Sequence, residues 1–196
     1  MADFLLEDEY NGLLVAGVDE AGRGPLMGPV FASAVIVDRS LEIPGINDSK
    51  KLSEKRREEL FEQIINHYKY GIGFASAEEI DKINILEATK LACKRAVGNL
   101  PLAPEVVLID GNMKFSMQNY ISVIKGDLLS ISIAAASILA KVSRDRLINE
   151  LAKSFPEYGW EKNKGYGTKS HMEAIAKFGL TIHHRQSFCK NLTNPE

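Results

Sequence analysis

The sequence predicts an α/β protein built on a mixed β-sheet. Residues 13–18 and 28–37 are two β-rich runs joined by a short stretch containing Gly and Pro, which indicates an antiparallel hairpin. After this hairpin, segments of helical periodicity alternate with short apolar runs. This order, with two strands first and then alternating helices and strands, favours a sheet with both antiparallel and parallel neighbours.

The size and composition are those of an ordinary globular protein. The chain has 196 residues, of which 45% are hydrophobic and 26% charged, so we expect a single domain over 1–196. The longest low-charge stretch, 128–140, is too short to span a bilayer, and the N-terminus is acidic where a signal peptide is basic. We therefore expect a cytoplasmic protein. Cys93 and Cys189 lack metal-ligand spacing, which disfavours zinc.

The first helix is expected after the hairpin. Ser53 is an N-cap candidate, and Leu60, Phe61, Ile64 and Ile65 follow at helical spacing. Beyond it, the pattern predicts a strand over 70–76, one or two helices over 77–99, and strands over 105–111 and 120–127.

The long helix expected over 132–153 begins with many small residues and should lie close against a sheet or another helix. Ser130 and Ser132 are its expected caps. A last helix over about 168–178 closes the predicted fold.

Charge is unevenly distributed along the chain. The formal net charge is −2, yet residues 141–190 hold ten Lys or Arg against five Asp or Glu. A basic surface beside an acidic site suits an enzyme that acts on a polyanion, although charged helix faces are commonly just solvated.

Three apolar runs end in carboxylates: Asp19 with Glu20, Asp110, and Asp127. Ligand sites in open α/β sheets gather where strands end, so these acids could converge, while plain solvated turns remain the alternative. Two like charges about 4 Å apart repel by roughly 4 kcal/mol at a protein surface, so converging acids must be protonated or share cations. Oxygen ligands select Mg²⁺ or Mn²⁺, and a pair of such ions supports phosphodiester hydrolysis.

Glu20 poses a geometric problem. On a regular strand Asp19 and Glu20 point to opposite faces of the sheet. We therefore expect the strand to end or bulge between them, since a regular strand would leave Glu20 outside the site.

Motifs along most of the chain resemble those of bacterial ribonucleases HII. They are "GVDEAGRGPLMGPV", "DSKKLSEKRR", "EIDKINILEATKLA", "VLIDG", "KGDLLSISIAAASILAKVSRDR", "YGWEKNKGYGTKSHMEAI" and "HHRQSF". The resemblance implies an RNase H-like fold with a mixed five-stranded sheet flanked by helices. We expect its core over about 13–153 and a small C-terminal helical region that contacts substrate over about 154–196. It also implies that Asp19, Glu20, Asp110 and Asp127 are catalytic and hold two Mg²⁺ or Mn²⁺ ions when substrate is bound.

The implied substrate is an RNA·DNA hybrid, or duplex DNA with embedded ribonucleotides. The family cuts on the 5′ side of the ribonucleotide and leaves a 3′-hydroxyl and a 5′-phosphate, in ribonucleotide excision repair and RNA primer removal. Gly22, Arg23 and Gly24 match the motif whose backbone approaches the ribose, and Tyr166 matches the tyrosine that packs on the neighbouring deoxyribose. Glycines permit such an approach because they have no side chain.

Phosphate contacts are expected from lysines on two segments. Lys50 and Lys51 lie in the "DSKKL" motif, and Lys164 lies near Tyr166, although solvated lysines are a competing interpretation. Arg144 could face either the duplex or solvent. The roles of His171, His183 and His184 are left open, with structural hydrogen bonding favoured.

Three alternatives accompany this interpretation. A ribonuclease HIII-like nuclease is disfavoured by the short N-terminus, and a non-catalytic nucleic-acid-binding relative would carry a broken acid, which this sequence lacks. A nucleotide-binding enzyme would require a helix where a strand pattern follows Pro25. We recognise no sliding-clamp peptide and expect a monomer.

Overall fold

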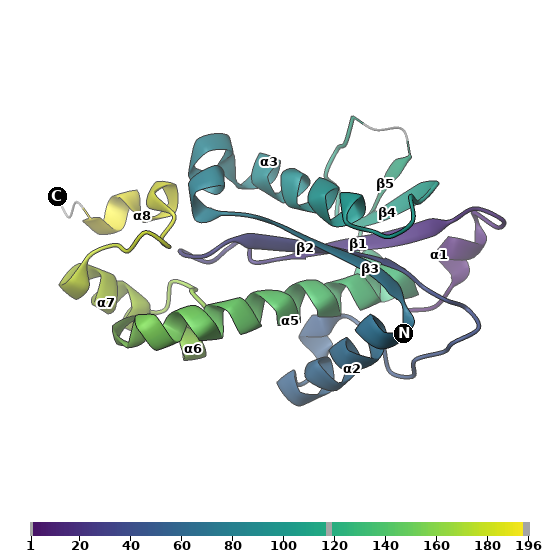
Figure 1. The fold of residues 1–196 in the computed structure, drawn as a ribbon. Coiled ribbons are helices and arrows are strands. Elements are labelled where there is room, and N and C mark those ends of the chain that lie inside the picture. The colour runs from purple at the N-terminus through teal and green to yellow at the C-terminus, as the bar shows by residue number, and fades with distance from the viewer. Residues whose placement is uncertain (1, 117–118, 194–196) are drawn as a thin grey trace.

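A computed structural model describes residues 2–116 and 119–193 of the chain. Its centre is a five-stranded sheet in the order β3-β2-β1-β4-β5 (Figure 1). The strands are β1 (Val15–Ala21), β2 (Val30–Ile36), β3 (Lys69–Ala75), β4 (Val106–Asp110) and β5 (Tyr120–Val123). β1 pairs antiparallel with β2, and β2 with β3, while the β1–β4 and β4–β5 pairs are parallel. The predicted mixed α/β sheet is confirmed.

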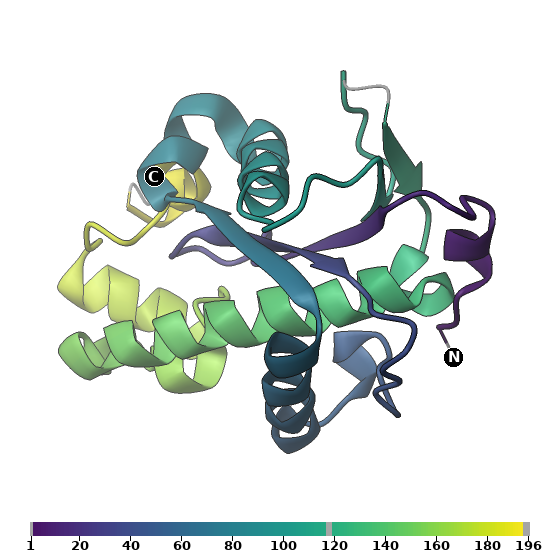
Figure 2. The same cartoon turned by 45° about the vertical axis from the view of Figure 1, so that its right-hand side comes forward.

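Helices cover both faces of the sheet. They are α1 (Leu5–Asp8), α2 (Glu54–His67), α3 (Ala77–Gly98), α4 (Gly126–Leu129), α5 (Ile131–Ser154), α6 (Trp160–Asn163), α7 (Lys169–Phe178) and α8 (Gln186–Thr193), with 3₁₀ turns η1 (Ser49–Lys51) and η2 (Pro156–Tyr158). α3 lies on one face and α5 on the other, with α2 beyond α5 (Figure 2). No helix within the described residues combines the length and the apolarity that crossing a membrane requires.

Local sequence signals explain where two of these helices begin or bend. Ser53 Oγ accepts a hydrogen bond from the amide of Arg56 at 3.2 Å, which caps α2 as predicted. α3 is two helices merged across Asn84, whose φ is +67°. The Asn84 side chain accepts from the amides of Leu86 and Glu87 and so caps the second half.

The long helix α5 packs directly on β1, as its small residues predicted. A Cβ added to Gly17 in β1 would lie 2.3 Å from the amide nitrogen of Ile133. On the neighbouring strand, Ser33 Oγ donates to the carbonyl of Ala136 at 2.7 Å. The close approach fixes the strand that carries Asp19 against the helix that follows Asp127.

The start of α5 differs in detail from the prediction. Ser130 is its N-cap and accepts from the amide of Ile133, whereas Ser132 lies inside the helix. Both hydroxyls donate to Oε1 of the buried Glu7, at 2.6 Å each. A carboxylate from α1 therefore satisfies the N-terminus of α5, a contact across about 125 residues that no local pattern indicates.

The chain does not close with the helix predicted over 168–178. That helix is present as α7, capped by Thr168, but α8 follows it. α8 has only eight residues, too few for a periodic pattern to stand out. Its first amides, from Gln186 and Ser187, donate to the side chain of Asp81 in α3, so the cap is distant in sequence.

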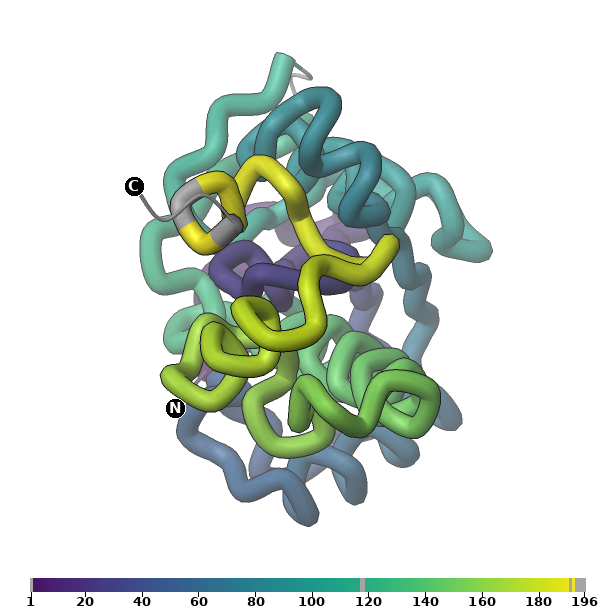
Figure 3. The backbone as a smooth tube through the Cα atoms, turned by 90° about the vertical axis from the view of Figure 1, so that its left-hand side faces the viewer, coloured from purple at the N-terminus to yellow at the C-terminus, as the bar shows by residue number. Residues whose placement is uncertain are grey.

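The C-terminal helices gather at one end of the molecule (Figure 3). They surround a small apolar cluster of their own, which includes Tyr158, Trp160, Ile175 and Ile148 together with Met27 from the loop between β1 and β2. This contact brings the C-terminal elements to the end of the sheet where β1 finishes.

We expect Gly17→Ala to destabilise the protein. The new methyl group would meet the backbone of α5, which cannot rotate away as a side chain would. The unfolding free energy should fall by about 1–3 kcal/mol or more, the usual cost of overpacking. Gly98→Ala is the control, because nothing lies within 4 Å of a Cβ at that helical position. Urea unfolding of both variants measures the effect, and equal stabilities would contradict the close packing.

Candidate active site

Three carboxylates from separate elements meet at one point. Asp19, Asp110 and Asp127 each offer an oxygen, and these atoms all lie within 4.8 Å of one another. β1 and β4 are parallel neighbours in the register Val18↔Ile109, so the residues after these two lie side by side. The predicted convergence of strand-end acids is thus present for these three.

Asp127 reaches the group by a different route from the one predicted. β5 ends at Val123, and Asp127 lies in the first turn of the short helix α4. Lys125 turns the chain there with a φ of +58°, and the amide of Gly126 donates to Asp110 Oδ1 at 2.7 Å. The expectation that strand 120–127 runs up to Asp127 is wrong, because the strand ends at Val123, the chain turns at Lys125, and a hydrogen bond to Asp110 holds the turn.

Glu20 lies beside the group but not in it. β1 continues in regular antiparallel register through Glu20↔Ala32 to Ala21, so the expected strand end or bulge between Asp19 and Glu20 is absent. The Glu20 side chain turns to Arg23, whose Nη1 donates to Glu20 Oε1 at 3.3 Å. Its Oε2 is buried and has no hydrogen-bond partner among the described residues.

The acids raise one another's pKa values. Burial raises the pKa of Asp19 well above its usual range, and the charges of Glu20 and Asp110 raise it further. Burial, followed by the charge of Asp110, also raises the pKa of Asp127. Burial raises the pKa of Glu20, while Arg23 opposes the shift. Without a cation, the group is therefore held in an electrostatically unfavourable state.

These residues fit a hard divalent cation. The donors are carboxylate oxygens, which suit Mg²⁺ or Mn²⁺, and their mutual repulsion would be relieved by a positive ion. The unpartnered, buried Oε2 of Glu20 is a further acceptor beside them. A set of carboxylate oxygens alone is a poor match for zinc, which proteins usually bind through Cys and His.

A pocket of about 140 Å³ opens beside the acids. It is lined by Asp19, Glu20, Gly22, Lys50, Lys141 and Tyr166 among others. Tyr166 is 46% exposed, and a Cβ on Gly24 would lie 3.5 Å from Tyr166 Cε1. The structure thus places the Gly22–Gly24 loop and Tyr166, both expected to contact substrate, at the rim of the acidic group.

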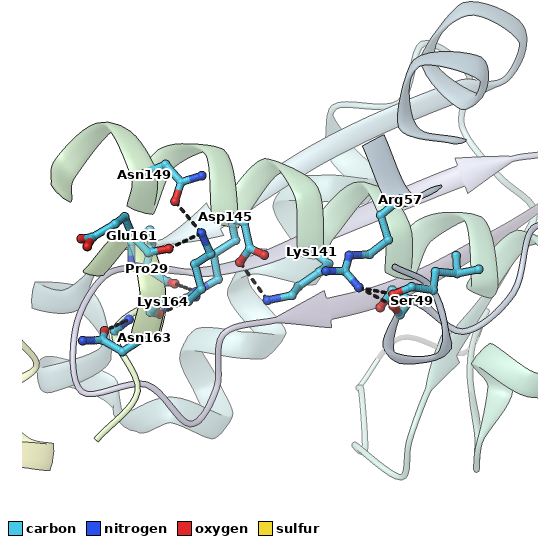
Figure 4. A network of polar contacts seen from close by, with 12 residues as sticks. Pro29, Ser49, Arg57, Lys141, Asp145, Asn149, Glu161, Asn163 and Lys164 are labelled. Atoms are coloured by element: carbon cyan, nitrogen blue, oxygen red, sulfur yellow. Dashed lines mark hydrogen bonds and ion pairs between the residues drawn. The ribbon is translucent and has the colours of Figure 1, made fainter. Parts of the chain in front are cut away.

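The expected phosphate-binding lysines lie in different surroundings. Lys50 is exposed, with Nζ 3.7 Å from Asp127 Oδ2, and Lys51 is exposed in the same turn, η1. Partial burial acts to lower the pKa of Lys50, but the negative charges of Asp19 and Asp127 outweigh it, so the pKa is raised. Lys164 is half-buried and its Nζ donates to Asn149 Oδ1 and to the carbonyl of Glu161 (Figure 4). The ammonium of Lys164 thus holds its own loop against α5.

The sequence did not indicate that two arginines near the site are buried. Arg144, expected to face the duplex or solvent, is only 1% exposed, and Arg185 is fully buried. Lys141 lines the pocket and donates to Asp145 at 2.8 Å (Figure 4). The motifs "KVSRDR" and "HHRQSF" contain these residues, but nothing in either motif indicates burial.

The histidines form a buried chain behind Tyr166. His171 Nδ1 donates to the carbonyl of Tyr166 at 2.9 Å, and its Nε2 accepts from Trp160 Nε1. His184 continues this series of side chains, with its Nε2 3.2 Å from Nε2 of His171. Burial, together with the neighbouring histidines, lowers the pKa of His184 to about 4. The structural role favoured for His171 therefore includes support of the tyrosine loop.

Comparisons with known proteins agree with this geometry. The family model described as "Ribonuclease HII" matches residues 16–191. Ribonuclease HII of Rickettsia akari (strain Hartford) is 60% identical over 182 residues, covering 93% of this chain and 94% of the relative. Among solved structures, ribonuclease H2 from Pyrococcus horikoshii OT3 superposes with a TM-score of 0.73 at 29% identity, covering 91% and 96% of the two chains. The structure of the PCNA:RNase HII complex from Archaeoglobus fulgidus gives 0.75 at 27% identity, covering 93% and 98%.

Asp127→Asn should reduce metal binding and stabilise the metal-free protein. Mn²⁺ that binds only the folded state raises stability by about 2.7 kcal/mol at 100 times its dissociation constant, so the wild type should show a large rise in melting temperature on adding Mn²⁺. The variant should show a much smaller rise. Glu150→Gln, on an exposed part of α5, is the control and should respond as the wild type does. Equal Mn²⁺ shifts in all three proteins would remove Asp127 from the site.

The same variant carries a pH signature without metal. Because burial raises the pKa of Asp127, the folded protein holds that proton more tightly than the unfolded chain. The wild type should therefore lose stability relative to Asp127→Asn as the pH rises above about 4, the usual pKa of an unfolded aspartate. Urea unfolding at several pH values measures the difference, and a constant difference would contradict the raised pKa.

Proposed function

Because this chain belongs to the ribonuclease HII family, we propose that it is a divalent-metal-dependent endoribonuclease that cuts at ribonucleotides in duplexes. It hydrolyses the phosphodiester on the 5′ side of a ribonucleotide, in RNA·DNA hybrids and at single ribonucleotides within DNA, leaving a 3′-hydroxyl and a 5′-phosphate. The observation that carries the proposal is the meeting of Asp19, Asp110 and Asp127 beside a pocket lined by the Gly22 loop and Tyr166.

Four acids have the catalytic role in this proposal. Asp19, Asp110 and Asp127 hold Mg²⁺ or Mn²⁺, and Glu20 joins them through the oxygen that has no partner among the described residues. Two such ions, present with substrate, would supply a water of lowered pKa and stabilise the departing 3′-oxygen. The hydrogen bond from Arg23 goes to the other oxygen of Glu20, Oε1, at 3.3 Å, so it would not have to break for Oε2 to hold an ion.

Recognition of the ribonucleotide is assigned to the loop and the tyrosine. The 2′-hydroxyl both donates and accepts hydrogen bonds, which lets a protein distinguish RNA from DNA at one sugar. Gly22 lines the pocket, and the backbone of Gly22, Arg23 and Gly24 contacts the sugar there. A side chain on Gly24 would come between this backbone and the ring of Tyr166, 3.5 Å from its Cε1. The half-exposed ring of Tyr166 packs on the adjoining deoxyribose and so detects the junction.

Lysines around the pocket bind the phosphates on either side. Lys50 and Lys51 extend from the η1 turn, and Lys50 already lies near Asp127. Such contacts supply affinity and register without reading sequence. Lys164 contributes mainly by holding the Tyr166 loop, since two groups of the protein accept from its ammonium.

In the cell this activity serves ribonucleotide excision repair and RNA primer removal. We infer a single domain in which residues 154–193 form a helical region that contacts substrate, the last three residues lying outside the described part of the chain. The Archaeoglobus fulgidus relative is described in complex with PCNA. For this chain, the missing clamp peptide, the monomeric state and the cytoplasmic location stay predictions.

A labelled DNA duplex with one embedded ribonucleotide tests the activity. The wild type should nick it on the 5′ side of that ribonucleotide in Mg²⁺ or Mn²⁺, and should leave an all-DNA duplex intact. Asp110→Asn should lose at least 100-fold in rate while still binding the duplex, since general electrostatic contributions to catalysis have about this size. Failure of the wild type to nick in either ion would exclude the proposal, and a preference for long hybrids alone would favour a ribonuclease HIII-like activity.

Tyr166→Ala should reduce cleavage at a single ribonucleotide more than cleavage of a continuous RNA·DNA hybrid. Only the first substrate has a deoxyribose next to the ribonucleotide at every cut, and stacking or packing on an aromatic ring is worth about 1–3 kcal/mol. Tyr166→Phe keeps the ring and should keep the preference. Equal losses of Tyr166→Ala on both substrates would exclude junction sensing.

A further inference from the structure

Arg185 lies beneath the loop that faces the pocket and is fully buried. Its guanidinium donates three hydrogen bonds, all to backbone carbonyls of one loop. The acceptors are Gly22 at 2.6 Å, Arg23 at 2.9 Å and Gly28 at 2.9 Å. Within the described residues the guanidinium forms no ion pair, so loop carbonyls, in place of a carboxylate, stabilise its charge.

A second buried arginine supports the same loop from α5. Arg144 donates to the carbonyls of Met27, Pro29 and Lys164, at distances of 3.0–3.3 Å. A Cβ on Gly22, whose φ is +96°, would lie 2.1 Å from Arg144 Nε. The Gly22 backbone therefore lies directly against both guanidinium groups, and only glycine fits there.

The hydrogen bonds of Arg185 determine which way two peptide units face. The carbonyl of Gly22 shares a peptide unit with the N–H of Arg23, and the carbonyl of Arg23 shares one with the N–H of Gly24. In a trans peptide these two groups point in opposite directions, and the described chain has no cis bond. With both carbonyls turned onto Arg185, both N–H groups are turned away from it.

Gly22 is among the residues that line the pocket and Arg185 is not, so we infer that the side of the loop away from Arg185 faces the pocket. Gly22 lines the pocket with Asp19, and Gly24 faces the ring of Tyr166. Two neighbouring N–H groups aimed at one point form a site for an oxygen that accepts hydrogen bonds, whether a hydroxyl or a phosphate oxygen. The buried positive charge behind them favours the phosphate further.

Arg185 is itself held in place from three directions. Its amide donates to the carbonyl of Leu26, and the amide of Gly28 donates to the carbonyl of His183. The next two residues begin α8, where Asp81 accepts from both of their amides. The short helix α8, which the sequence pattern did not indicate, thus holds the guanidinium of Arg185 against the loop.

We propose that Arg185 is a positioning residue for ribonucleotide recognition: it holds the Gly22–Gly24 backbone so that the N–H groups of Arg23 and Gly24 bind the 2′-hydroxyl and the adjoining phosphate. This inference rests on the proposed function of the site. Arg185 does not touch substrate and acts through the loop. A lysine in its place would keep the charge but lose the planar set of donors that reaches three carbonyls.

Binding in Ca²⁺ to two duplexes tests the proposal, one all-DNA and one with a single ribonucleotide. The wild type should prefer the ribonucleotide duplex, and Arg185→Lys should lose about tenfold of that preference, the value of about 1.4 kcal/mol of hydrogen bonding, while its affinity for all-DNA stays near the wild type. A merely structural defect would weaken both duplexes alike. Arg146→Lys is the control, because Arg146 is exposed and pairs with Glu58 and Glu62.

Asp81→Asn provides a milder test should Arg185→Lys fail to fold. It loosens the start of α8 without touching the loop, and should lose part of the same preference while the melting temperature stays close to the wild type. Wild-type preference in either folded variant would overturn the inference and leave the proposed function standing. A wild type that neither prefers the ribonucleotide duplex nor nicks it in Mg²⁺ would overturn both.

Discussion

Mutual repulsion among buried carboxylates is the constraint on which the site depends. Asp19, Asp110 and Asp127 are brought within 4.8 Å by the parallel pairing of β1 and β4 and by the turn into α4. Burial and neighbouring charges hold the pKa values of Asp19 and Asp127 above their usual range. A fold maintains such an arrangement only with rigid support, and here α5 packs so closely on β1 that Gly17 has no room for a side chain. The unfavourable charge is what a divalent cation would relieve.

The loop beside the acids packs on buried positive charges, in contrast to the buried negative charges of the acids. Arg144 and Arg185 are buried cations whose charges are stabilised by loop carbonyls, at hydrogen-bond distances of 2.6–3.3 Å. Turning carbonyls inward turns amides outward, and in our proposal the hydrogen bonds that stabilise these cations also leave amides facing a sugar or a phosphate. In our proposal, acids that hold metal ions thus lie beside amides that bind oxygen, next to one pocket that both Asp19 and Gly22 line.

Local patterns predicted the mixed sheet, the cap of α2 and the packing of α5, because apolar strand runs, an N-cap serine and a run of small residues can each be recognised within one short segment. They also indicated that strand-end acids could converge, because ligand sites gather where strands end, and the structure brings three of the four together. They failed where distant residues decide the outcome: Asp81 caps α8, Glu7 caps α5, and Arg144 is buried by a loop more than a hundred residues away. The strand end or bulge expected between Asp19 and Glu20 was wrong, because β1 keeps its regular pairing with β2 as far as Ala21.

We propose that a metal ion held by these acids contacts the phosphate that is cut. Sulfur placed at either non-bridging oxygen of that phosphate, next to a single ribonucleotide, tests this contact, because Mg²⁺ prefers hard oxygen ligands and Mn²⁺ accepts sulfur more readily. For at least one of the two diastereomers, cleavage should fall strongly in Mg²⁺ and largely recover in Mn²⁺. The same loss in both ions for both diastereomers would contradict direct contact between the metal and the phosphate.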